Sequence, residues 1–188
     1  MTDSIQRSFV AIFPPKDVVG RVLSVQTAVA ALAPRMHCVR PESLHCTVEF
    51  LGNKSLSWLE QLAGRLTKDI VARPFQILLD RIGCFSSRRS PKVFWLGSEE
   101  EQNMELRQLT AVVRSTCLDI GHRPTDDHFR PHMTIGRSKG KIDITLIQNL
   151  ETVTFQPITF VCDEIRVMKS TLASTGSTYT TLFTISLK

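Results

Sequence analysis

The stretch LHCTVEFLG, residues 44–52, alternates like a β-strand and carries a polar pair on one face. Because side chains alternate between the two faces of a strand, His45 and Thr47 point to the same side. The same alternation gives the other side three apolar residues, Cys46, Val48 and Phe50. The stretch therefore predicts a strand with one face for the hydrophobic core and a His–Thr pair on the other.

The pattern returns later in the chain, in FRPHMTIGR at residues 129–137. Here His132 and Thr134 share a face, and Met133 and Ile135 pack behind them. Each half of the chain thus holds one H-x-T strand, with further strands and helices around it. We interpret this as an internal repeat that brings two polar pairs to one site.

Two histidines and two threonines suit the cleavage of a phosphoester without a metal. Imidazole titrates near pH 6.5, so one ring can accept a proton from attacking water while the other gives a proton to the departing oxygen. The threonine hydroxyls can donate to phosphate oxygens. Arg137 adds a cation, but strict alternation places it on the wrong face. We therefore expect Gly136 to end the strand or to allow a β-bulge.

Other motifs do not add a cofactor. His128 and His132 are four residues apart, but Pro131 between them argues against a helical metal pair. Asp126, Asp127 and His128 are interpreted as a solvated loop. The sequence has no G-x-x-x-x-G-K-[ST] loop and no G-x-S-x-G elbow. We predict neither a metal nor a cofactor.

Composition indicates a globular protein, and its modest positive charge is compatible with a polyanionic partner without requiring one. The chain has 188 residues, of which 42% are apolar, and a formal charge of +5. This length suits one domain, or two small lobes that share a core. The five cysteines are scattered and never form C-x-x-C, which argues against disulfides and zinc. The apolar runs are too short to span a membrane, and MTDSIQRSF does not resemble a secretion signal, so we expect a cytoplasmic protein.

Periodicity predicts strands that alternate irregularly with helices. The expected strands are 7–13, 44–52, 74–85, 92–98, 130–138, 153–161, 163–170 and 178–186. The expected helices are 16–33, 56–71, 100–120 and 143–149, with Ser55 or Ser57 as the cap of the second. Because regular parallel winding would alternate more strictly, we predict an α+β fold with antiparallel sheets.

Four ordered motifs resemble the 2H phosphoesterase superfamily, and within it the bacterial and archaeal RNA 2′,3′-cyclic phosphodiesterases, also called 2′-5′ RNA ligases. They are R-x-F-x-A-I-x-x-P at 7–15, the two H-x-T stretches, and S-x-L-x-x-x-G-x-x-Y-x-x-L at 170–182. Cys46, Val48 and Met133 depart from the family's usual aliphatic residues. All three lie on the predicted core face, so the departures concern packing.

The resemblance implies a bilobal fold in which two pseudo-symmetric halves, with antiparallel sheets and outer helices, face a central cleft. Residues 1–188 would form one domain of two intertwined lobes. It also implies hydrolysis of RNA 2′,3′-cyclic phosphate ends to a 2′-phosphate, without a metal. His45 would be the proton donor and His132 the proton acceptor, while Thr47, Thr134 and Arg137 would hold the phosphate. Run in reverse with a 5′ hydroxyl in place of water, the same chemistry would be an ATP-independent 2′-5′ ligation.

Contacts with the rest of the substrate are less defined by the sequence. Phe9, Phe50, Arg130 and Tyr179 are candidates to contact a nucleoside, and Arg88 and Arg89 to guide an RNA backbone. The expected partner is the end of an RNA or oligoribonucleotide, bound by a monomer. Two alternatives stay open. One is a cyclic phosphodiesterase for a small nucleotide of the ADP-ribose cyclic phosphate type. The other is a non-catalytic RNA-binding module, for which permanently charged Lys or Arg would suit better than histidine.

Overall fold

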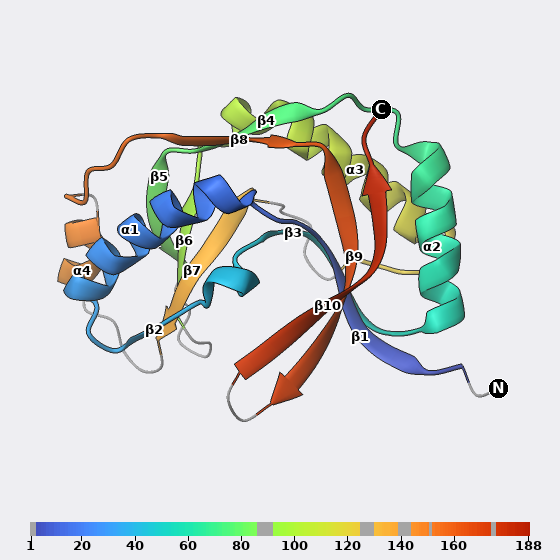
Figure 1. The fold of residues 1–188 in the computed structure, drawn as a ribbon, viewed down its shortest axis with the longest axis horizontal. Coiled ribbons are helices and arrows are strands. Elements are labelled where there is room, and N and C mark those ends of the chain that lie inside the picture. Colours follow the sequence, from blue (N-terminus) through green and yellow to red (C-terminus); the bar gives the residue numbers. More distant parts are fainter. Residues whose placement is uncertain (1–2, 86–91, 125–129, 139–143, 151, 174–175) are drawn as a thin grey trace.

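The structure is a computed structural model that describes residues 3–85, 92–124, 130–138, 144–150, 152–173 and 176–188 (Figure 1). The elements up to residue 85 are β1 (Ile5–Ile12), α1 (Lys16–Leu32), β2 (Met36–Cys38), the 3-10 helix η1 (Pro41–Ser43), β3 (Cys46–Ser55), α2 (Leu56–Asp69), β4 (Phe75–Leu79) and β5 (Arg81–Phe85). The later elements are β6 (Lys92–Gly97), the 3-10 helix η2 (Glu100–Asn103), α3 (Met104–Asp119), β7 (His132–Ser138), α4 (Ile144–Leu150), β8 (Ile158–Cys162), β9 (Glu164–Ala173) and β10 (Gly176–Ser186).

One antiparallel sheet runs through both halves of the molecule. Its strand order is β10-β9-β1-β3-β7-β6-β5, and β2 pairs with the end of β7. Strands β4 and β8 form a separate antiparallel pair. The prediction of an α+β fold with antiparallel sheets and outer helices is confirmed.

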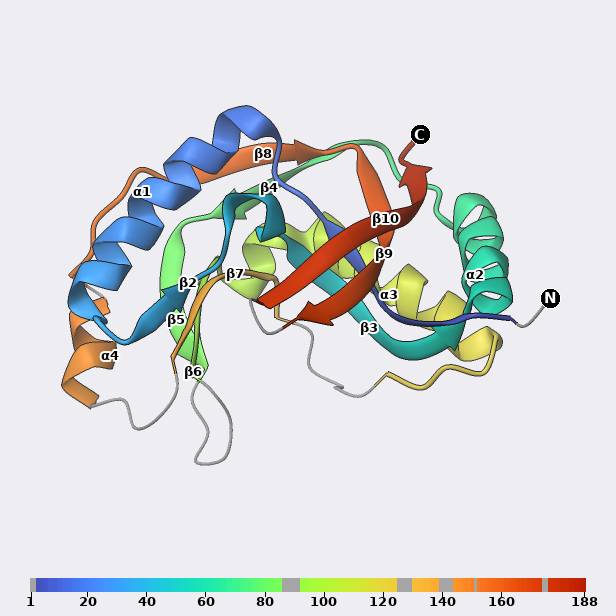
Figure 2. The same ribbon diagram turned by 60° about the horizontal axis from the view of Figure 1, so that its bottom comes forward.

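The helices are exchanged between the two halves of the sheet. Helix α1 directly follows β1, yet it contacts β7, β2 and α4 in the other half. Helix α3 directly follows the β5–β6 hairpin and η2, yet it contacts β3 and α2 in the first half. Figures 1 and 2 show α1 and α4 together at one side of the molecule and α2 and α3 together at the opposite side. Each half therefore combines a motif strand with two covering helices.

The two motif strands meet at the middle of the sheet. Among the described residues, β3 and β7 are joined by one residue pair, Cys46 with Met133. Both are the central residue of an H-x-T motif. Beyond this pair, β3 continues along β1, and β7 continues between β2 and β6. The Cys46–Met133 pair therefore lies at the centre of the internal repeat that relates the two halves.

Four of the five residues predicted for the core side of the motif strands are buried as expected. Cys46, Val48, Met133 and Ile135 are almost fully buried. All five cysteines are free, which confirms the absence of disulfides. Ser55 caps α2, because its hydroxyl accepts a hydrogen bond from the Trp58 amide at 3.2 Å.

Three predicted elements differ from those observed. The predicted strand 74–85 is divided at Asp80, where the chain leaves the pairing with β8 and joins β6. The Asn103 side chain hydrogen-bonds both the amide and the carbonyl of Leu78 at 2.9 Å, which fixes the chain just before this change of sheet. The predicted helix 100–120 begins with the 3-10 turn η2, and the strand predicted at 153–161 begins only at Ile158.

Candidate active site

The four polar motif residues surround the Cys46–Met133 pair. In an antiparallel pair the residues on either side of a bridge lie opposite one another, so His45 faces Thr134 and Thr47 faces His132. All four are directed away from the buried side that Cys46 and Met133 occupy. The two histidines are diagonal neighbours, for which Cβ atoms are about 7–8 Å apart or somewhat less. This spacing leaves room for one phosphate between the rings.

Both histidines are oriented by the same local contact. His45 Nδ1 donates to the carbonyl of Ser43 at 2.7 Å, and His132 Nδ1 donates to the carbonyl of Arg130, also at 2.7 Å. A carbonyl oxygen only accepts, so each neutral ring carries its proton on Nδ1. Nε2 is therefore the nitrogen with a lone pair available to a ligand in both rings.

A β-bulge in each motif strand turns a further side chain to the same face. In β7 the pairing with β6 passes from Thr134 to Gly136, so Ile135 is the extra residue. In β3 the pairing with β1 passes from Thr47 to Glu49, so Val48 is the extra residue. Each bulge inverts the alternation that follows it. Arg137 and Phe50 therefore join the motif residues, each five positions after its histidine.

The bulge expected near Gly136 is thus confirmed, and a second expectation is corrected. Strict alternation placed Phe50 on the core side with Cys46 and Val48. The bulge at Val48 instead leaves Phe50 58% exposed on the opposite side of β3. The internal repeat therefore extends further than the sequence alone indicated, because Phe50 and Arg137 occupy equivalent positions in the two halves.

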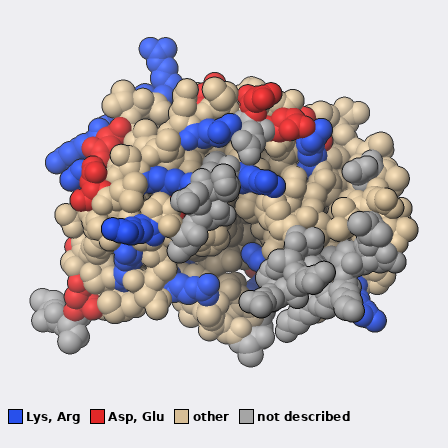
Figure 3. Space-filling view, turned by 180° about the vertical axis from the view of Figure 1, so that it is seen from behind, with Lys and Arg blue, Asp and Glu red and all other residues tan. Residues whose placement is uncertain are grey.

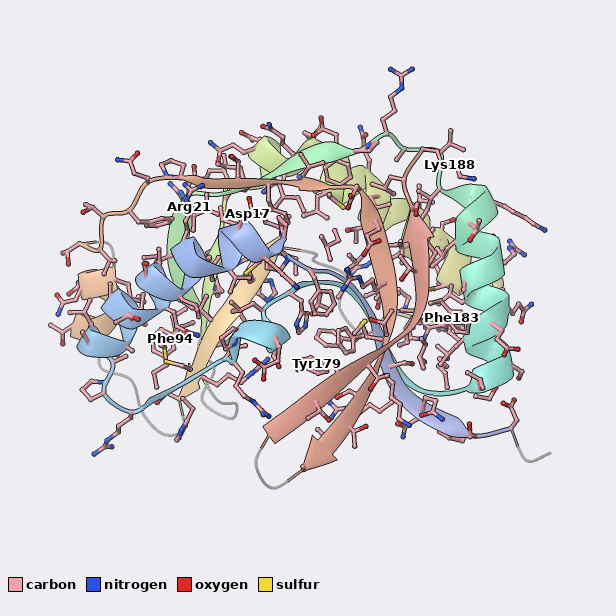
Figure 4. All side chains as sticks on the ribbon, in the orientation of Figure 1. Asp17, Arg21, Phe94, Tyr179, Phe183 and Lys188 are labelled. Atoms are coloured by element: carbon pink, nitrogen blue, oxygen red, sulfur yellow. The ribbon has the colours of Figure 1, made fainter. Side chains whose placement is uncertain are left out.

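These side chains line a cleft of about 640 Å³. The residues around it are Arg7, Ser8, Phe9, Val39, Ser43, His45, Thr47, Phe50, Gly52, Phe85, Val93, His132, Thr134, Arg137, Ser170, Ser177 and Tyr179. In Figure 4 the Tyr179 ring projects from β10 into the space between the β9–β10 hairpin and η1. Strands from both halves and the final hairpin therefore form one cavity around the two motifs.

The two imidazoles differ in their surroundings. The His45 ring contacts three aromatic rings, with centroid distances of 5.0 Å to Phe9, 5.5 Å to Phe13 and 5.2 Å to Tyr179. The His132 ring contacts Phe85, edge to face, at 4.9 Å. Aromatic rings cannot solvate an imidazolium as water does. Because His45 contacts more such rings than His132, its surroundings oppose protonation more strongly.

Burial lowers the pKa of both histidines. Burial is the main reason that the pKa of His45 falls from 6.5 to about 4, and the charges of Arg137 and His132 lower it further. The pKa of His132 is lowered first by burial and then by Arg137. The hydrogen bonds to the Ser43 and Arg130 carbonyls act in the opposite direction. Both rings are therefore neutral near pH 7 in the free protein, and an anion between them is needed to favour a proton.

Some of the residues predicted from the sequence line this cleft, and others do not. The cleft brings together His45, Thr47, His132, Thr134 and Arg137, as well as Phe9, Phe50 and Tyr179. Phe9 is only 4% exposed and packs as a wall behind His45. Arg130 lends its carbonyl to His132, but its exposed side chain does not line the cleft. Arg88, Arg89, Asp126, Asp127 and His128 lie outside the described residues.

Sequence reasoning missed several residues of the cleft that are polar or aromatic. Among them are Arg7, Ser170, Ser177 and Phe85. One signal was present for Arg7, since it lies two residues before Phe9 on the same strand and thus on the same face. The other three come from β5, β9 and β10, whose approach to the motifs depends on the tertiary fold.

No three His, Cys, Asp or Glu side chains in the described ranges are grouped so that they could hold a metal ion. In the same part of the chain, every helix is too short or too polar to cross a lipid bilayer.

Two imidazoles and two hydroxyls that face one cleft from antiparallel strands define a site of the two-histidine phosphoesterase class. The chain belongs to the 2′-5′ RNA ligase superfamily, whose model matches residues 14–173. The RNA 2′,3′-cyclic phosphodiesterase of Archaeoglobus fulgidus is 32% identical over 135 residues, covering 72% of this chain and 74% of that protein. The enzyme of the same name from Thermotoga maritima is 32% identical over 146 residues, covering 77% and 76%.

Solved structures give the same result for the fold. The apo crystal structure of E. coli LigT matches with a TM-score of 0.78 and 26% identity, and covers 98% of both chains. LigT complexed with 3′-AMP matches with a TM-score of 0.79 and 25% identity, covering 98% of this chain and 99% of that one. The predicted family and the predicted fold are confirmed.

Proposed function

We propose that this protein hydrolyses the 2′,3′-cyclic phosphate at the end of an RNA to a 2′-phosphate. The observation that carries the proposal is the single Cys46–Met133 pair, which sets two H-x-T motifs around one point of the cleft. The relatives named RNA 2′,3′-cyclic phosphodiesterase support it. Thr47 and Thr134 donate hydroxyl hydrogens to the phosphate oxygens, and the Arg137 guanidinium offsets the charge that develops on them.

The reaction needs one proton acceptor and one proton donor on opposite sides of phosphorus. His132 Nε2 takes a proton from water as the water oxygen forms its bond to phosphorus. His45 Nε2 gives a proton to O3′ as the P–O3′ bond breaks. The products are a 2′-phosphate and a 3′ hydroxyl, and the two imidazoles have exchanged protonation states. Positioned proton transfer of this kind contributes on the order of 10²–10⁴ per step.

The surroundings of the histidines support the donor role of His45. Three aromatic rings destabilise its imidazolium, which makes the protonated ring a stronger acid. The cyclic phosphate carries the negative charge that favours a proton on this ring in the complex. Release of the product removes that charge. The prediction of one neutral and one protonated imidazole therefore applies to the substrate complex.

The same geometry permits ligation by the same ring opening with a different nucleophile. If a 5′ hydroxyl takes the place of water, His132 removes its proton and a new phosphodiester forms, while His45 again protonates O3′. The bond energy of the cyclic phosphate drives this step, so no ATP is required. Hydrolysis is favoured in water, because water is far more concentrated than any RNA 5′ end.

The direct test uses an oligoribonucleotide that ends in a 2′,3′-cyclic phosphate. His45→Ala and His132→Ala should each lower kcat by at least about 10²-fold, since each removes one proton-transfer group. Product analysis should show a 2′-phosphate, and EDTA should leave the rate unchanged. His37→Ala is a matched control, because it removes an exposed histidine of β2 that does not line the cleft. Full activity in both histidine variants, or loss of the wild-type rate in EDTA, would reject the mechanism.

Two further properties belong to the same proposal. We propose that a monomer is active, because one chain brings both H-x-T motifs and Arg137 to the same cleft. Size-exclusion chromatography at the concentrations used for kinetics measures this directly. We also propose that the enzyme works on RNA ends in the cytoplasm, which localisation of the tagged full-length protein tests.

A further inference from the structure

We propose that Arg7 forms a second phosphate subsite, which binds the phosphate on the 5′ side of the nucleotide that carries the cyclic phosphate. The cleft would then select RNA chains and 5′-phosphorylated nucleotides over nucleosides that carry the cyclic phosphate alone. This inference rests on the proposed function and specifies its substrate class.

The strand directions place Arg7 and Arg137 on opposite sides of the two motifs. Strands β3 and β7 run in opposite directions from the Cys46–Met133 pair. Arg137 lies four residues along β7 in one direction, where it pairs with His37 and Val93. Arg7 pairs with Asn53, which lies beyond Phe50 in the other direction. A ligand whose reacting phosphate sits between the histidines therefore has a cation on either side.

The span toward Arg7 suits a nucleoside followed by a phosphate. Ala11 pairs with Thr47, and Arg7 is four residues from Ala11 along β1. At a rise of about 3.3 Å per residue the two backbone positions are about 13 Å apart. Phe50 lies between them and is 58% exposed, which offers an aromatic surface to a base or ribose. The flexible Arg7 side chain covers the remaining distance to the next phosphate.

The charge at this end of the cleft is not neutralised. Arg7 and Arg137 are the two cations among the described residues that line the cleft. Within the described ranges, no carboxylate forms an ion pair with Arg7. Ser170 follows Lys169, which pairs with Ser8, so the register places Ser170 opposite Arg7, and both residues line the cleft. A guanidinium with a neighbouring hydroxyl is a suitable donor set for a phosphodiester.

A second hollow near the centre is unfavourable for an anion. It lies behind Phe13 and has a volume of about 610 Å³, and its lining includes the carboxylates Asp17, Asp163 and Glu164. Its arginine, Arg166, is held by Glu164 at 2.6 Å. Figure 3 shows that on the face opposite to that of Figure 1 the visible Lys and Arg side chains are dispersed rather than joined in one patch. An RNA backbone is therefore best accommodated along β1 toward Arg7.

The test compares substrates that differ by one phosphate. They are a nucleoside 2′,3′-cyclic phosphate, the same compound with a 5′-phosphate, and an oligoribonucleotide with a cyclic end. We define the selectivity as kcat/KM with the 5′-phosphate divided by kcat/KM without it. Arg7→Gln should lower this selectivity about 10- to 100-fold, the usual loss for a hydrogen bond to a charged group. The salt dependence on the oligoribonucleotide should weaken by about 0.7 in the logarithmic slope.

Two further variants make the result specific. Arg73→Gln removes an exposed arginine outside the cleft and should keep the wild-type selectivity. Arg7→Lys retains the charge and should restore a substantial part of it, which separates loss of charge from misfolding. Unchanged selectivity in Arg7→Gln would overturn the subsite. If the wild type cleaves none of the three compounds, the proposed function itself fails.

Discussion

The surroundings of the two histidines favour neutral rings, whereas the proposed proton transfer requires one ring to be protonated. Burial holds the pKa of His45 at about 4 and also lowers the pKa of His132, so the free protein keeps both rings neutral. Catalysis needs one proton to be shared between them. A substrate anion would stabilise this proton, because a negative charge between the rings favours the imidazolium. Under the proposed mechanism, the two histidines thus become an acid–base pair when a phosphate is bound.

This coupling predicts that stability depends on pH. In the folded protein the pKa of His45 lies below the unfolded value of 6.5, so the unfolded chain binds protons more readily. The contribution of His45 is complete above pH 6.5 and is lost as the pH falls from 6.5 toward about 4. Urea unfolding should show this loss in the wild type and a smaller one in His45→Gln, which does not titrate.

Proton NMR of the ring resonances gives an independent measurement. His45 should titrate well below pH 6.5 in the free protein, and a bound nucleoside 2′-phosphate should raise its pKa. A free-protein titration of His45 near 6.5 would contradict the enclosure by Phe9, Phe13 and Tyr179.

At the scale of the elements, the bulges give the two motif strands different roles. Val48 and Ile135 are equivalent extra residues, and each turns the residue two positions later into the cleft. That residue is Phe50 in the first half and Arg137 in the second. A repeated backbone therefore presents an aromatic surface on one side and a cation on the other. Under the proposed function, this asymmetry orients the substrate, with the reacting phosphate toward Arg137 and the nucleoside toward Phe50.

Behind β3, a buried ion pair stabilises the bulged strand. Glu49 is 3% exposed, and its carboxylate accepts a hydrogen bond from Arg114 Nε of α3 at 2.8 Å. Removal of one member of a buried pair leaves the other charge poorly compensated. We expect Glu49→Ala to lower the free energy of unfolding by about 3 kcal/mol. In a double-mutant cycle with Arg114→Ala, the coupling should be about 1–3 kcal/mol.

A surface pair gives the control for this measurement. Arg65 and Asp119 are 3.1 Å apart, but both side chains are largely exposed. Asp119→Ala should therefore change the free energy of unfolding by less than about 1 kcal/mol. Chemical denaturation of the four cycle variants and this control decides the point. Equal effects of Glu49→Ala and Asp119→Ala would show that burial adds nothing to the Glu49–Arg114 pair.

The sequence predicted those elements whose apolar period is long. Helices 16–33 and 56–71 and both motif strands were found in place. The strand β2 has three residues, too few for a period, and it forms because β7 offers an edge. The division at Asp80 depends on Asn103, twenty-three residues later, so no local pattern contains it. The bulge at Val48 was missed for a related reason, because register is a property of two strands and not of one.

The site followed a similar division. His45, Thr47, His132 and Thr134 were predicted because one strand shows which side chains share a face. Arg137 required a bulge, which the wrong-facing arginine itself suggested. Arg7 and the serines of the final hairpin were not predicted, since their approach depends on how β1, β9 and β10 are ordered in the sheet. The sequence therefore shows which side chains share a face of one strand, whereas contacts between strands depend on the order of the strands in the sheet.

At the scale of the whole molecule, the exchange of helices links the two halves. The half that contains β3 is covered by α3, and the half that contains β7 is covered by α1, although each helix follows a strand of the other half. Neither half can therefore unfold without exposing the apolar face of a helix tethered to its partner. We expect residues 1–188 to behave as one cooperative domain.

The two tryptophans allow this to be measured in each half separately. Trp58 lies in α2, beside β3 and α3, and Trp95 lies in β6, paired with Thr134 of β7. Trp95→Phe leaves a reporter in the first half, and Trp58→Phe leaves one in the second. For each variant, the urea midpoint from fluorescence should coincide with the midpoint from far-ultraviolet circular dichroism of the same variant.

Ligand binding gives a further test of whether the two halves unfold together, because residues from both halves line the cleft. A nucleoside 2′-phosphate binds only the folded protein, so it should raise the midpoint by RT ln(1 + [L]/Kd). In one cooperative domain, both tryptophans report the full increase. If the halves were independent domains, the ligand would bind only when both are folded, and the less stable half would show most of the increase. Unequal shifts, or two separated transitions in either variant, would therefore show that the exchanged helices do not couple the lobes.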